Sequence, residues 1–493
     1  MRFASLLMMG VFCFGSAAMS AEKVVGDSNK ISLDISVYNR SLALVKDVRK
    51  VSLSSGENNI AFEGVAANIK PETAILFGNG IKVLEQNYDY DLLNAENLAA
   101  KSVGETVKTV VTNPSNGEKI FDQAEIISAG YGRPVLKFKY GVDPDFPGRL
   151  VYEKIPAGLR NKPTLVAKVI SDKTENKDIS LAYLTNGISW KTNYVVNVVD
   201  QNLLNLTGWV TINNESGVDY NNAKVQLIAG DVNEVQEIMR GRGMVKAMAV
   251  YDAAASINGV LAEGASEEEL GGYHLYNLPN KTTIKDKQTK QISLIEKNNV
   301  KYKKEANISS QLYFNPGSRA EFKQVHPNMY YIINNKEEDN LGFQLPAGII
   351  RFYEKDEGGN LQFIGENSIN HVAKGETMRL RLGNFVNIFA NGKINSIEKV
   401  SEKAPVPDGA RCKKTEKKYL YKAEVSITNS GKNAQEVVYT QNLPTDAMIT
   451  TFAPHKGTQK QSGVYEWRVS VPADGTEVIK FSVTAPHIDR VCD

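Results

Sequence analysis

The chain of 493 residues carries 58 lysine and arginine residues against 56 aspartate and glutamate residues, a formal net charge of +2 at pH 7. Such balanced charge is not typical of proteins that bind nucleic acid or an anionic surface. We therefore expect no nucleic-acid partner. The length is sufficient for about three or four domains of ordinary size.

The N-terminus has the pattern of a secretory signal peptide, which we place at residues 1–20. Arg2 supplies the positive charge, an apolar run of about a dozen residues follows, and small residues come next. Ala18 and Ser20 fit the small-x-small rule, so cleavage is expected before Ala21, with cleavage after Ala21 as the alternative. An uncleaved anchor is disfavoured because roughly 20 apolar residues are needed to span a bilayer. The sequence thus predicts a periplasmic or secreted protein with no integral membrane segment.

The mature chain is predicted to open with an N-terminal β domain at residues 21–92. Short runs of apolar and polar residues, separated by glycine and asparagine, predict strands at 31–38, 42–53 and 58–62. Apolar residues with the spacing of a helix are missing from this stretch.

Residues 93–165 are predicted to form a small inserted β module with one short helix. Asn94 can cap this helix and Gly104 can end it, so the helix is expected over residues 94–102. Short strand-like runs follow around a tight Asn-Pro-Ser-Asn-Gly turn. A small barrel-like module is the expected structure.

The main β domain is predicted at residues 166–403. Its clearest part is 181–233, where apolar and polar residues alternate and Asn-Gly turns separate the strands. Residues 239–272 lack such a pattern and are predicted to form a mobile loop, with a flexible partner-binding arm as the alternative. The lysine-rich stretch 281–304 is predicted to be a solvated sheet edge rather than an anion-binding patch.

The last predicted domain, 404–493, has the cleanest alternation in the chain. Tyr421, Val425 and Ile427 face one way along a predicted strand, and Trp467 belongs to a similar strand. Strands of this kind with regular turns are typical of an immunoglobulin-like sandwich. The fold class is therefore predicted to be mainly β, with several β-sandwich or barrel-like modules, a C-terminal immunoglobulin-like sandwich and few short helices.

Two cysteines, Cys412 and Cys492, remain after removal of the signal peptide. One is expected just before the first strand of the last domain and the other just after its last strand. Because exported proteins form disulfides in an oxidising compartment, we expect these cysteines to pair. Two free thiols on unrelated faces are the alternative.

Long motifs occur in three stretches. Residues 181–233 contain SWK-x-x-Y, GWV-T-x-x-N-x-SG and A-x-x-QL-x-AGDVN, residues 273–294 are YHLYNLPNKTTIKDKQTKQISL, and the third stretch, 340–383, begins NLGFQLPAGIIRFYEK. These motifs resemble a family of secreted bacterial β-rich proteins of unknown function, whose shared domain also forms the C-terminal part of mucoidy-inhibitor-type proteins. The resemblance covers most of residues 35–385. It implies a β fold and carries no reaction.

Four residues are candidates for binding a ligand. Trp190 and Trp209 lie in the strands with the shared motifs, where they can fill a core between sheets or offer a platform for stacking a carbohydrate. His274 is predicted on a strand beside tyrosines, and His371 in a turn. Both histidines are expected to be structural, with ligand binding or catalysis as the alternative.

The sequence offers no candidate catalytic residue, metal ligand set or cofactor motif. The five histidines have no paired spacing, and a CxxC pair, a nucleophile elbow and a phosphate-binding glycine loop are missing. Paired carboxylates for glycoside cleavage need a fold to bring them together. Enzymatic activity is therefore undecided and disfavoured.

The function predicted from these observations is that of an exported β-sheet protein, acting as a non-enzymatic binding or structural module. Another envelope protein and a polysaccharide are the candidate partners. The first alternative is a hydrolase acting on a cell-wall or extracellular polysaccharide. The second is an assembly chaperone, by analogy of fold alone.

Overall fold

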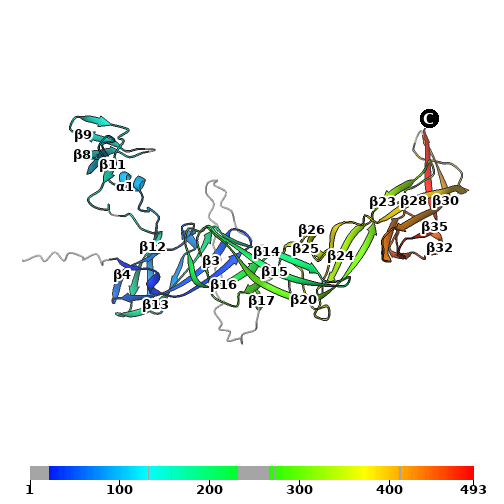
Figure 1. The fold of residues 1–493 in the computed structure, drawn as a ribbon, viewed down its shortest axis with the longest axis horizontal. Coiled ribbons are helices and arrows are strands. Elements are labelled where there is room, and N and C mark those ends of the chain that lie inside the picture. Colours follow the sequence, from blue (N-terminus) through cyan, green and yellow to red (C-terminus); the bar gives the residue numbers. More distant parts are fainter. Residues whose placement is uncertain are drawn as a thin grey trace, which may run out of the picture. The chain divides into compact units, whose positions relative to one another are not determined.

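The computed structural model describes residues 22–130, 133–156, 158–230, 266–270, 273–409 and 412–492 (Figure 1). The predicted signal peptide lies outside the described residues. Strands dominate the described chain, which confirms a mainly β fold. The chain forms two compact units: unit 1 comprises Met1–Trp190 and Thr211–Gln291, and unit 2 comprises Lys191–Val210 and Ile292–Asp493. The predicted domain boundaries stay a proposal.

Two of the sheets in unit 1 lie outside the small module. The described strands of the first follow the order β1 (Lys23–Val25), β4 (Gly56–Glu63), β12 (Thr164–Ser171) and β6 (Ile81–Asp89). The second follows the order β17 (Ser266–Leu270), β18 (Tyr273–Asn277), β16 (Tyr220–Ala229), β2 (Lys30–Tyr38), β3 (Leu42–Leu53), β13 (Glu175–Asn186) and β5 (Ile75–Phe77), with β19 (Thr282–Ile284) beside β16. Of the predicted loop 239–272, residues 266–270 form strand β17, and the remainder lies outside the described residues.

A buried arginine joins these two sheets. Arg49 on β3 is fully buried and donates to Asp47 Oδ2 at 2.7 Å. The same guanidinium donates to the backbone oxygens of Val25 on β1, at 2.6 Å, and Glu63 at the end of β4, at 2.8 Å. A buried charge is tolerated only when it is paired and hydrogen-bonded, and both conditions hold here.

The small module also has the predicted helix. Helix α1 (Ala95–Lys101) begins after Asn94, whose side chain accepts a hydrogen bond from Asn97 N at 2.8 Å. Gly104 has a φ of +85°, a left-handed conformation that glycine adopts without strain. The sheet beside α1 has the described order β10 (Gly141–Asp143), β9 (Val135–Phe138), β8 (Lys119–Ser128), β7 (Thr106–Thr112) and β11 (Arg149–Val151).

Unit 2 is built on a long sheet whose described path is β26 (Leu361–Ile369), β25 (Gly348–Lys355), β14 (Ile188–Val198), β15 (Leu203–Asn214), β20 (Gln288–Ile308), β31 (Gln435–Asn442), β34 (Val464–Val471) and β33 (Thr458–Gln461), with β24 (Asn328–Asn334) and β27 (Thr377–Asn384) off this path. The boundary between the units falls within β14, β15 and β20.

A second sheet of unit 2 completes the C-terminal sandwich. Its described strands are β23 (Glu321–Val325), β28 (Ile388–Glu402), β30 (Cys412–Asn429), β35 (Gly475–Cys492) and β32 (Met448–Ala453), with β29 (Val406–Pro407) beside β30; β21 (Phe314–Asn315) and β22 (Ser318–Arg319) form a short hairpin. Strand β28, which precedes residue 404, pairs along β30. The sandwich therefore draws strands from both sides of the predicted boundary.

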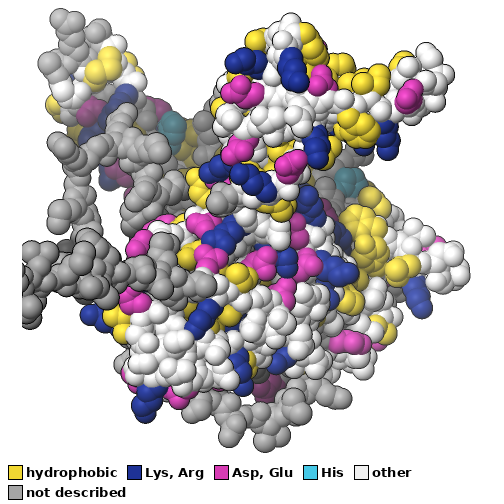
Figure 2. Space-filling model, turned by 90° about the vertical axis from the view of Figure 1, so that its left-hand side faces the viewer, with side chains coloured by type: hydrophobic (Ala, Val, Ile, Leu, Met, Phe, Trp, Pro, Cys, Tyr) yellow, Lys and Arg dark blue, Asp and Glu magenta, His cyan; other side chains and the backbone are white. Residues whose placement is uncertain are grey.

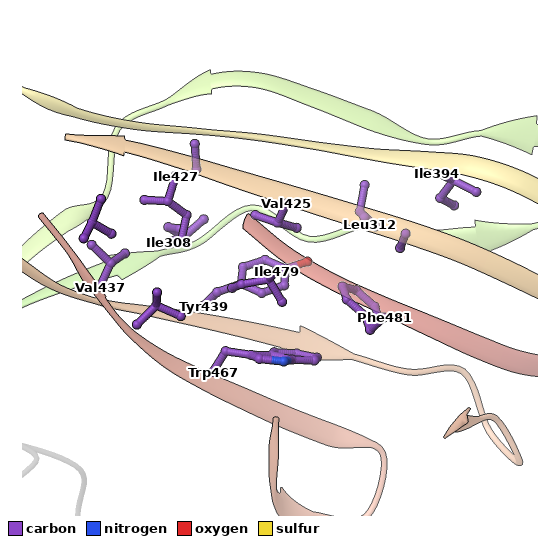
Figure 3. Close-up of a cluster of buried hydrophobic side chains, with 14 of the residues drawn as sticks. Ile308, Leu312, Ile394, Val425, Ile427, Val437, Tyr439, Trp467, Ile479 and Phe481 are labelled. Atoms are coloured by element: carbon purple, nitrogen blue, oxygen red, sulfur yellow. The ribbon is translucent and has the colours of Figure 1, made fainter. Parts of the chain in front are cut away.

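Trp467 lies in the sandwich core beside Tyr439 and Phe481, as Figure 3 shows. Its ring centroid is 4.9 Å from that of Phe481 and 5.6 Å from that of Tyr439. Tyr421, Val425 and Ile427 point into the same core, as their alternation predicts. Aromatic side chains bury large apolar areas, so this cluster contributes substantially to the stability of the sandwich.

On the surface shown in Figure 2, lysine and arginine side chains lie among aspartate and glutamate side chains, with hydrophobic side chains between them. The lysine-rich stretch follows this mixed pattern. Lys303 Nζ lies 2.7 Å from Glu436 Oε1, and Lys304 Nζ lies 3.4 Å from Glu354 Oε2. The first part of the stretch lies at β19, which pairs with β16 off the main sheet path, and the rest lies on β20, inside the sheet path of unit 2. The prediction of an edge strand is not met for the part on β20.

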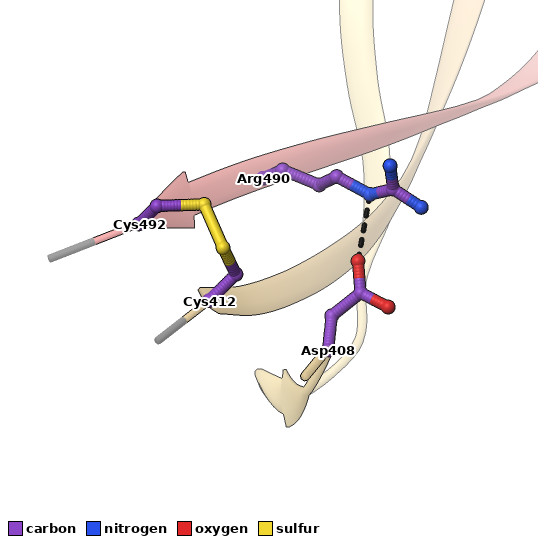
Figure 4. The surroundings of a disulfide bond; sticks show 4 residues. All are labelled: Asp408, Cys412, Arg490 and Cys492. Atoms are coloured by element: carbon purple, nitrogen blue, oxygen red, sulfur yellow. Dashed lines mark ion pairs between the residues drawn. A yellow bond between two sulfur atoms is a disulfide. The ribbon is translucent and has the colours of Figure 1, made fainter. Parts of the chain in front are cut away.

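The predicted disulfide is present. Cys412 on β30 and Cys492 on β35 face each other across the ladder, their Cα atoms are 4.0 Å apart, and their sulfurs are bonded (Figure 4). An ion pair between Arg490 Nε and Asp408 Oδ2, 2.7 Å long, lies beside the bridge. Side chains at this end of the ladder are largely exposed, so little apolar burial stabilises it. The covalent bond therefore holds an end of the two strands that packing alone would leave weak.

Replacement of Cys412 by serine is expected to destabilise the C-terminal sandwich. The bridge joins residues 80 apart in sequence, and the chain-entropy model gives about 4–5 kcal/mol for a loop of that size, less any strain. Urea unfolding of unreduced protein measures the change. Cys492→Ser should cost the same, and the double variant no more than either. Two titratable thiols in the unreduced native protein would contradict the bridge.

Candidate functional site

One side of the sheet β26–β25–β14–β15 faces the core of unit 2. Tyr194 and Val196 on β14, Leu206 on β15, and Ile350 and Phe352 on β25 are buried in one hydrophobic cluster. Successive side chains of a strand point to opposite faces. The residues between these core positions must therefore point away from the core.

We call this second side the open face. It consists of the outward side chains of Asn205, Thr207 and Trp209 on β15, Asn193, Val195 and Asn197 on β14, Ile349, Arg351 and Tyr353 on β25, and Leu361, Phe363 and Glu366 on β26. Several of its large apolar residues are exposed: Trp209 by 37%, Ile349 by 39%, Leu361 by 55% and Phe363 by 55%. Large apolar residues gathered on one exposed face indicate a surface used for binding.

The strand register fixes where these residues lie. Strand β25 runs parallel to β14, with Asn193 beside Ile349 and Asn197 beside Tyr353. Between β14 and β15, Val199 N donates to Leu203 O, and continuing that antiparallel register places Trp209 opposite Asn193. On the other side of β25, Tyr353 is paired with Phe363 on β26. Trp209 and the Tyr353–Phe363 pair thus occupy opposite ends of the open face.

The aromatic pair has a defined geometry. The ring centroids of Tyr353 and Phe363 are 5.6 Å apart, and their planes make an angle of 60°. This separation falls in the range that aromatic pairs prefer. The contact fixes both rings on the surface before any ligand arrives.

A polar row crosses the open face between its aromatic ends. Arg351 Nε donates to Glu366 Oε2 at 3.0 Å, and Arg351 Nη1 donates to Asn193 Oδ1 at 3.3 Å. These groups come from β26, β25 and β14. The row presents charged and amide groups, already oriented by one another, to anything that lies across the sheet.

A cavity of about 610 Å³ lies at the end of the open face where β25 ends and β26 begins. Asn197, Asn205, Lys355 and Leu361 contribute to its lining, together with Glu354. Asn205 Oδ1 accepts a hydrogen bond from Asn299 N at 3.0 Å, which holds this side chain in place. Val198 and Val199 also line the cavity, so it offers apolar as well as polar side chains, a combination that suits an amphipathic ligand.

The core beneath the open face contains stacked tyrosines. The rings of Tyr302 and Tyr331 are 5.1 Å apart and nearly parallel, and Lys304 Nζ lies 5.3 Å from the Tyr331 ring centroid. Burial, and to a lesser degree the Glu354 carboxylate, raises the pKa of both phenols far above the ordinary value. Both phenols stay neutral at physiological pH, so the layer that supports the open face does not change its charge.

The two candidate tryptophans occupy different environments. Trp190 is 3% exposed, donates from Nε1 to Ile228 O at 3.3 Å and meets the edge of Tyr276. It is a core residue of unit 1 and cannot present a ring to a ligand. Trp209 belongs to unit 2 and lies on the open face. Only Trp209 of this pair is available for stacking, and its role in binding stays a proposal.

The candidate histidines also lie in separate units. His274 is half-buried on β18, opposite Ala229 on β16. His371 is exposed near the bridge between Leu345 and Val372, and its Nδ1 accepts a hydrogen bond from Ala347 N at 3.3 Å. Because these histidines belong to different units and strands, they give no basis for a common site.

Sequence reasoning missed Tyr353, Phe363 and Arg351 as members of a surface. In the segment around Tyr353, apolar residues occupy positions on both faces of the strand, so alternation alone does not tell inside from outside. The usable signal was Arg351, a charge between Ile350 and Phe352, which marks its own face as the solvent side. Tyr353 is two residues after Arg351 on the same strand, so its side chain shares the face of Arg351. This rule would have predicted that the Tyr353 ring points outward.

Among the residues that the structure describes, no group of three or more histidine, cysteine, aspartate or glutamate side chains is arranged to hold a metal ion. In the same part of the chain, no helix has the length and apolar character needed to cross a membrane.

Comparison with known proteins finds one family. A family model described as a domain of unknown function, DUF4139, matches residues 179–487, which is more than half of the chain. No curated protein matches the sequence. The matched region includes every strand of the open face, β14, β15, β25 and β26, over its full length.

Fluorescence quenching should single out Trp209. The chain has three tryptophans; Trp190 and Trp467 are buried, and Trp209 is partly exposed. Acrylamide is expected to quench only the Trp209 fraction of the emission, and Trp209→Phe should abolish nearly all accessible quenching. Trp190→Phe is the control that should leave the quenchable component in place. Persistent quenching in the Trp209→Phe protein would contradict the orientation of β15.

Proposed function

Since the chain belongs to the DUF4139 family, whose function is unknown, we propose a function from its own geometry: it is an exported, non-enzymatic protein that binds a partner on the open face. The observation that carries this proposal is the exposure of Trp209 and Phe363 on one side of a sheet whose other side is a closed core. Exposed aromatic side chains are costly to leave in water unless they serve an interaction.

Export is supported by two independent features. The first residues carry the pattern of a secretory signal, and the chain contains the Cys412–Cys492 bridge. Disulfides persist in oxidising compartments such as the periplasm or the extracellular space. The shared motifs with secreted bacterial proteins and with the C-terminal part of mucoidy-inhibitor-type proteins agree with a location in the cell envelope. The partner class that follows is an envelope protein or a polysaccharide.

The alternative, a polysaccharide hydrolase, has less support. Such an enzyme pairs two carboxyl groups across the bond that it cleaves, one of them kept protonated. On the open face, Glu366 Oε2 already accepts a hydrogen bond from Arg351 Nε at 3.0 Å. Glu354 is engaged by Lys304 at 3.4 Å. These arrangements suit fixed charges that orient a ligand better than they suit an acid catalyst.

Processing of the signal peptide is directly measurable. Protein recovered from its native envelope or medium should begin at Ala21 or Glu22, because signal peptidase cleaves after small residues. Intact-mass measurement gives the mature N-terminus. A chain that still begins at Met1 in that fraction would refute export by a cleaved signal.

Binding through the open face is tested with the mature full-length protein and isolated envelope material. We expect sedimentation with that material to be lost in the triple variant Trp209→Ala, Tyr353→Ala, Phe363→Ala, because the variant removes all three rings from the face. Tyr313→Ala is the matched control, since Tyr313 is a 77% exposed aromatic of unit 2 on the segment before β21, away from the open face. Circular dichroism confirms that each variant is folded.

Equal sedimentation of the triple variant and the wild-type protein would overturn a binding role for this face. If the Tyr313→Ala control also lost its sedimentation with envelope material, the interaction would depend on exposed hydrophobic side chains in general. This outcome would also count against a binding role for the open face.

A further inference from the structure

We propose that the open face binds an uncharged oligosaccharide, laid across the strands from Trp209 to the Tyr353–Phe363 pair. This inference rests on the proposed function and adds the chemical class of the ligand. Sugar rings expose apolar C–H faces and a rim of hydroxyl groups. A partner of this chemistry needs aromatic surfaces and hydrogen-bonding groups side by side, and the open face supplies both.

The aromatic groups suit C–H faces. The face of an aromatic ring carries partial negative charge and attracts the weakly positive C–H bonds that a sugar ring presents. Trp209, Tyr353 and Phe363 are held on a rigid sheet rather than on loops, so little conformational entropy is lost when a ring stacks on them. The 5.6 Å contact between Tyr353 and Phe363 fixes both rings beforehand.

The spacing of the aromatic ends suits a chain of several sugar rings. Trp209 and Tyr353 are two strands apart and, in the register above, four residues apart along the strands. With ordinary strand spacing and rise, their Cα atoms are about 16 Å apart. A single sugar cannot reach both ends, whereas an extended oligosaccharide can.

The groups between the aromatic ends suit hydroxyls. The Glu366–Arg351–Asn193 row offers donors and acceptors in fixed positions across three strands. Asn197 and Asn205 add amide groups to the lining of the adjoining cavity. A hydroxyl group donates one hydrogen bond and accepts others, so it can bond to amide, carboxylate and guanidinium groups alike.

The charge of the face favours an uncharged ligand. Arg351 on the face is matched by the Glu366 carboxylate at 3.0 Å, and the lining of the adjoining cavity holds one lysine, Lys355, and one carboxylate, Glu354. A strongly charged ligand would have to compete with the Arg351–Glu366 contact, whereas hydroxyl groups can bond to both groups without breaking it.

The experiment is calorimetric titration of the mature full-length protein with hexasaccharides. The uncharged probes are the hexasaccharides of β-1,4-linked glucose, β-1,4-linked N-acetylglucosamine and α-1,4-linked glucose, and the anionic probe is α-1,4-linked hexagalacturonate. We expect at least one uncharged hexasaccharide to bind and the anionic one to bind more weakly. Trp209→Ala and Phe363→Ala should each weaken binding by about tenfold or more, as expected for truncating a central aromatic contact.

Two comparisons separate stacking from lesser effects. Trp209→Phe keeps a flat ring and should retain much of the affinity, whereas Trp209→Leu keeps apolar area without a ring and should behave like Trp209→Ala. Tyr313→Ala should leave affinity unchanged. Outward substitutions of this kind are expected to change stability little. Urea unfolding of each variant checks that it is folded.

Failure of all three uncharged probes, preferred binding of the anionic probe, or binding that Trp209→Ala leaves intact would each overturn the inference. If the triple variant nevertheless loses its sedimentation with envelope material, the proposed function stands with a different ligand. If that sedimentation also persists, both proposals fail.

Discussion

The burial of one side of the β26–β25–β14–β15 sheet is the constraint on which the open face depends. Tyr194 and Phe352 fix the inward rows, and a shift of one residue in either strand would turn every side chain over. Gly208 contributes through its missing side chain, because a Cβ there would lie 2.7 Å from Ile295 Cγ2 and 3.0 Å from Tyr194 Cε1. The core thus packs closely beneath β15, and Trp209, the next residue, is directed outward.

The residues that stabilise the fold are different from those that we propose to bind a ligand. The aromatic centre around Trp467, the buried Arg49 and the Cys412–Cys492 bridge hold their sheets together without any residue of the open face. The rings of Tyr353 and Phe363 therefore have no role in closing a core. Residues that can be replaced without unfolding the protein are the ones on which a binding surface can be built and tested.

Local sequence pattern predicted much of the fold. Alternation identified the inward face of the C-terminal sandwich, and capping chemistry identified the helix after Asn94, because both signals lie within a few residues of chain. Local parity around Arg351 could have predicted that Tyr353 points outward, but not that the strands of the open face lie side by side, because this depends on parallel pairing of Asn193 with Ile349, far apart in sequence. Trp190 and Trp209 both belong to the shared motifs, which do not show which of the two is buried. Their packing in the folded protein decides this.

The most direct test of the open face as a ligand surface is the indole N–H spectrum of the ¹⁵N-labelled protein during titration with a hexasaccharide that binds. The three tryptophans give three indole signals. The account predicts that the Trp209 signal shifts with saturation, while the signals of the buried Trp190 and Trp467 stay in place. A saturable shift of either buried tryptophan with an unmoved Trp209 signal would contradict it.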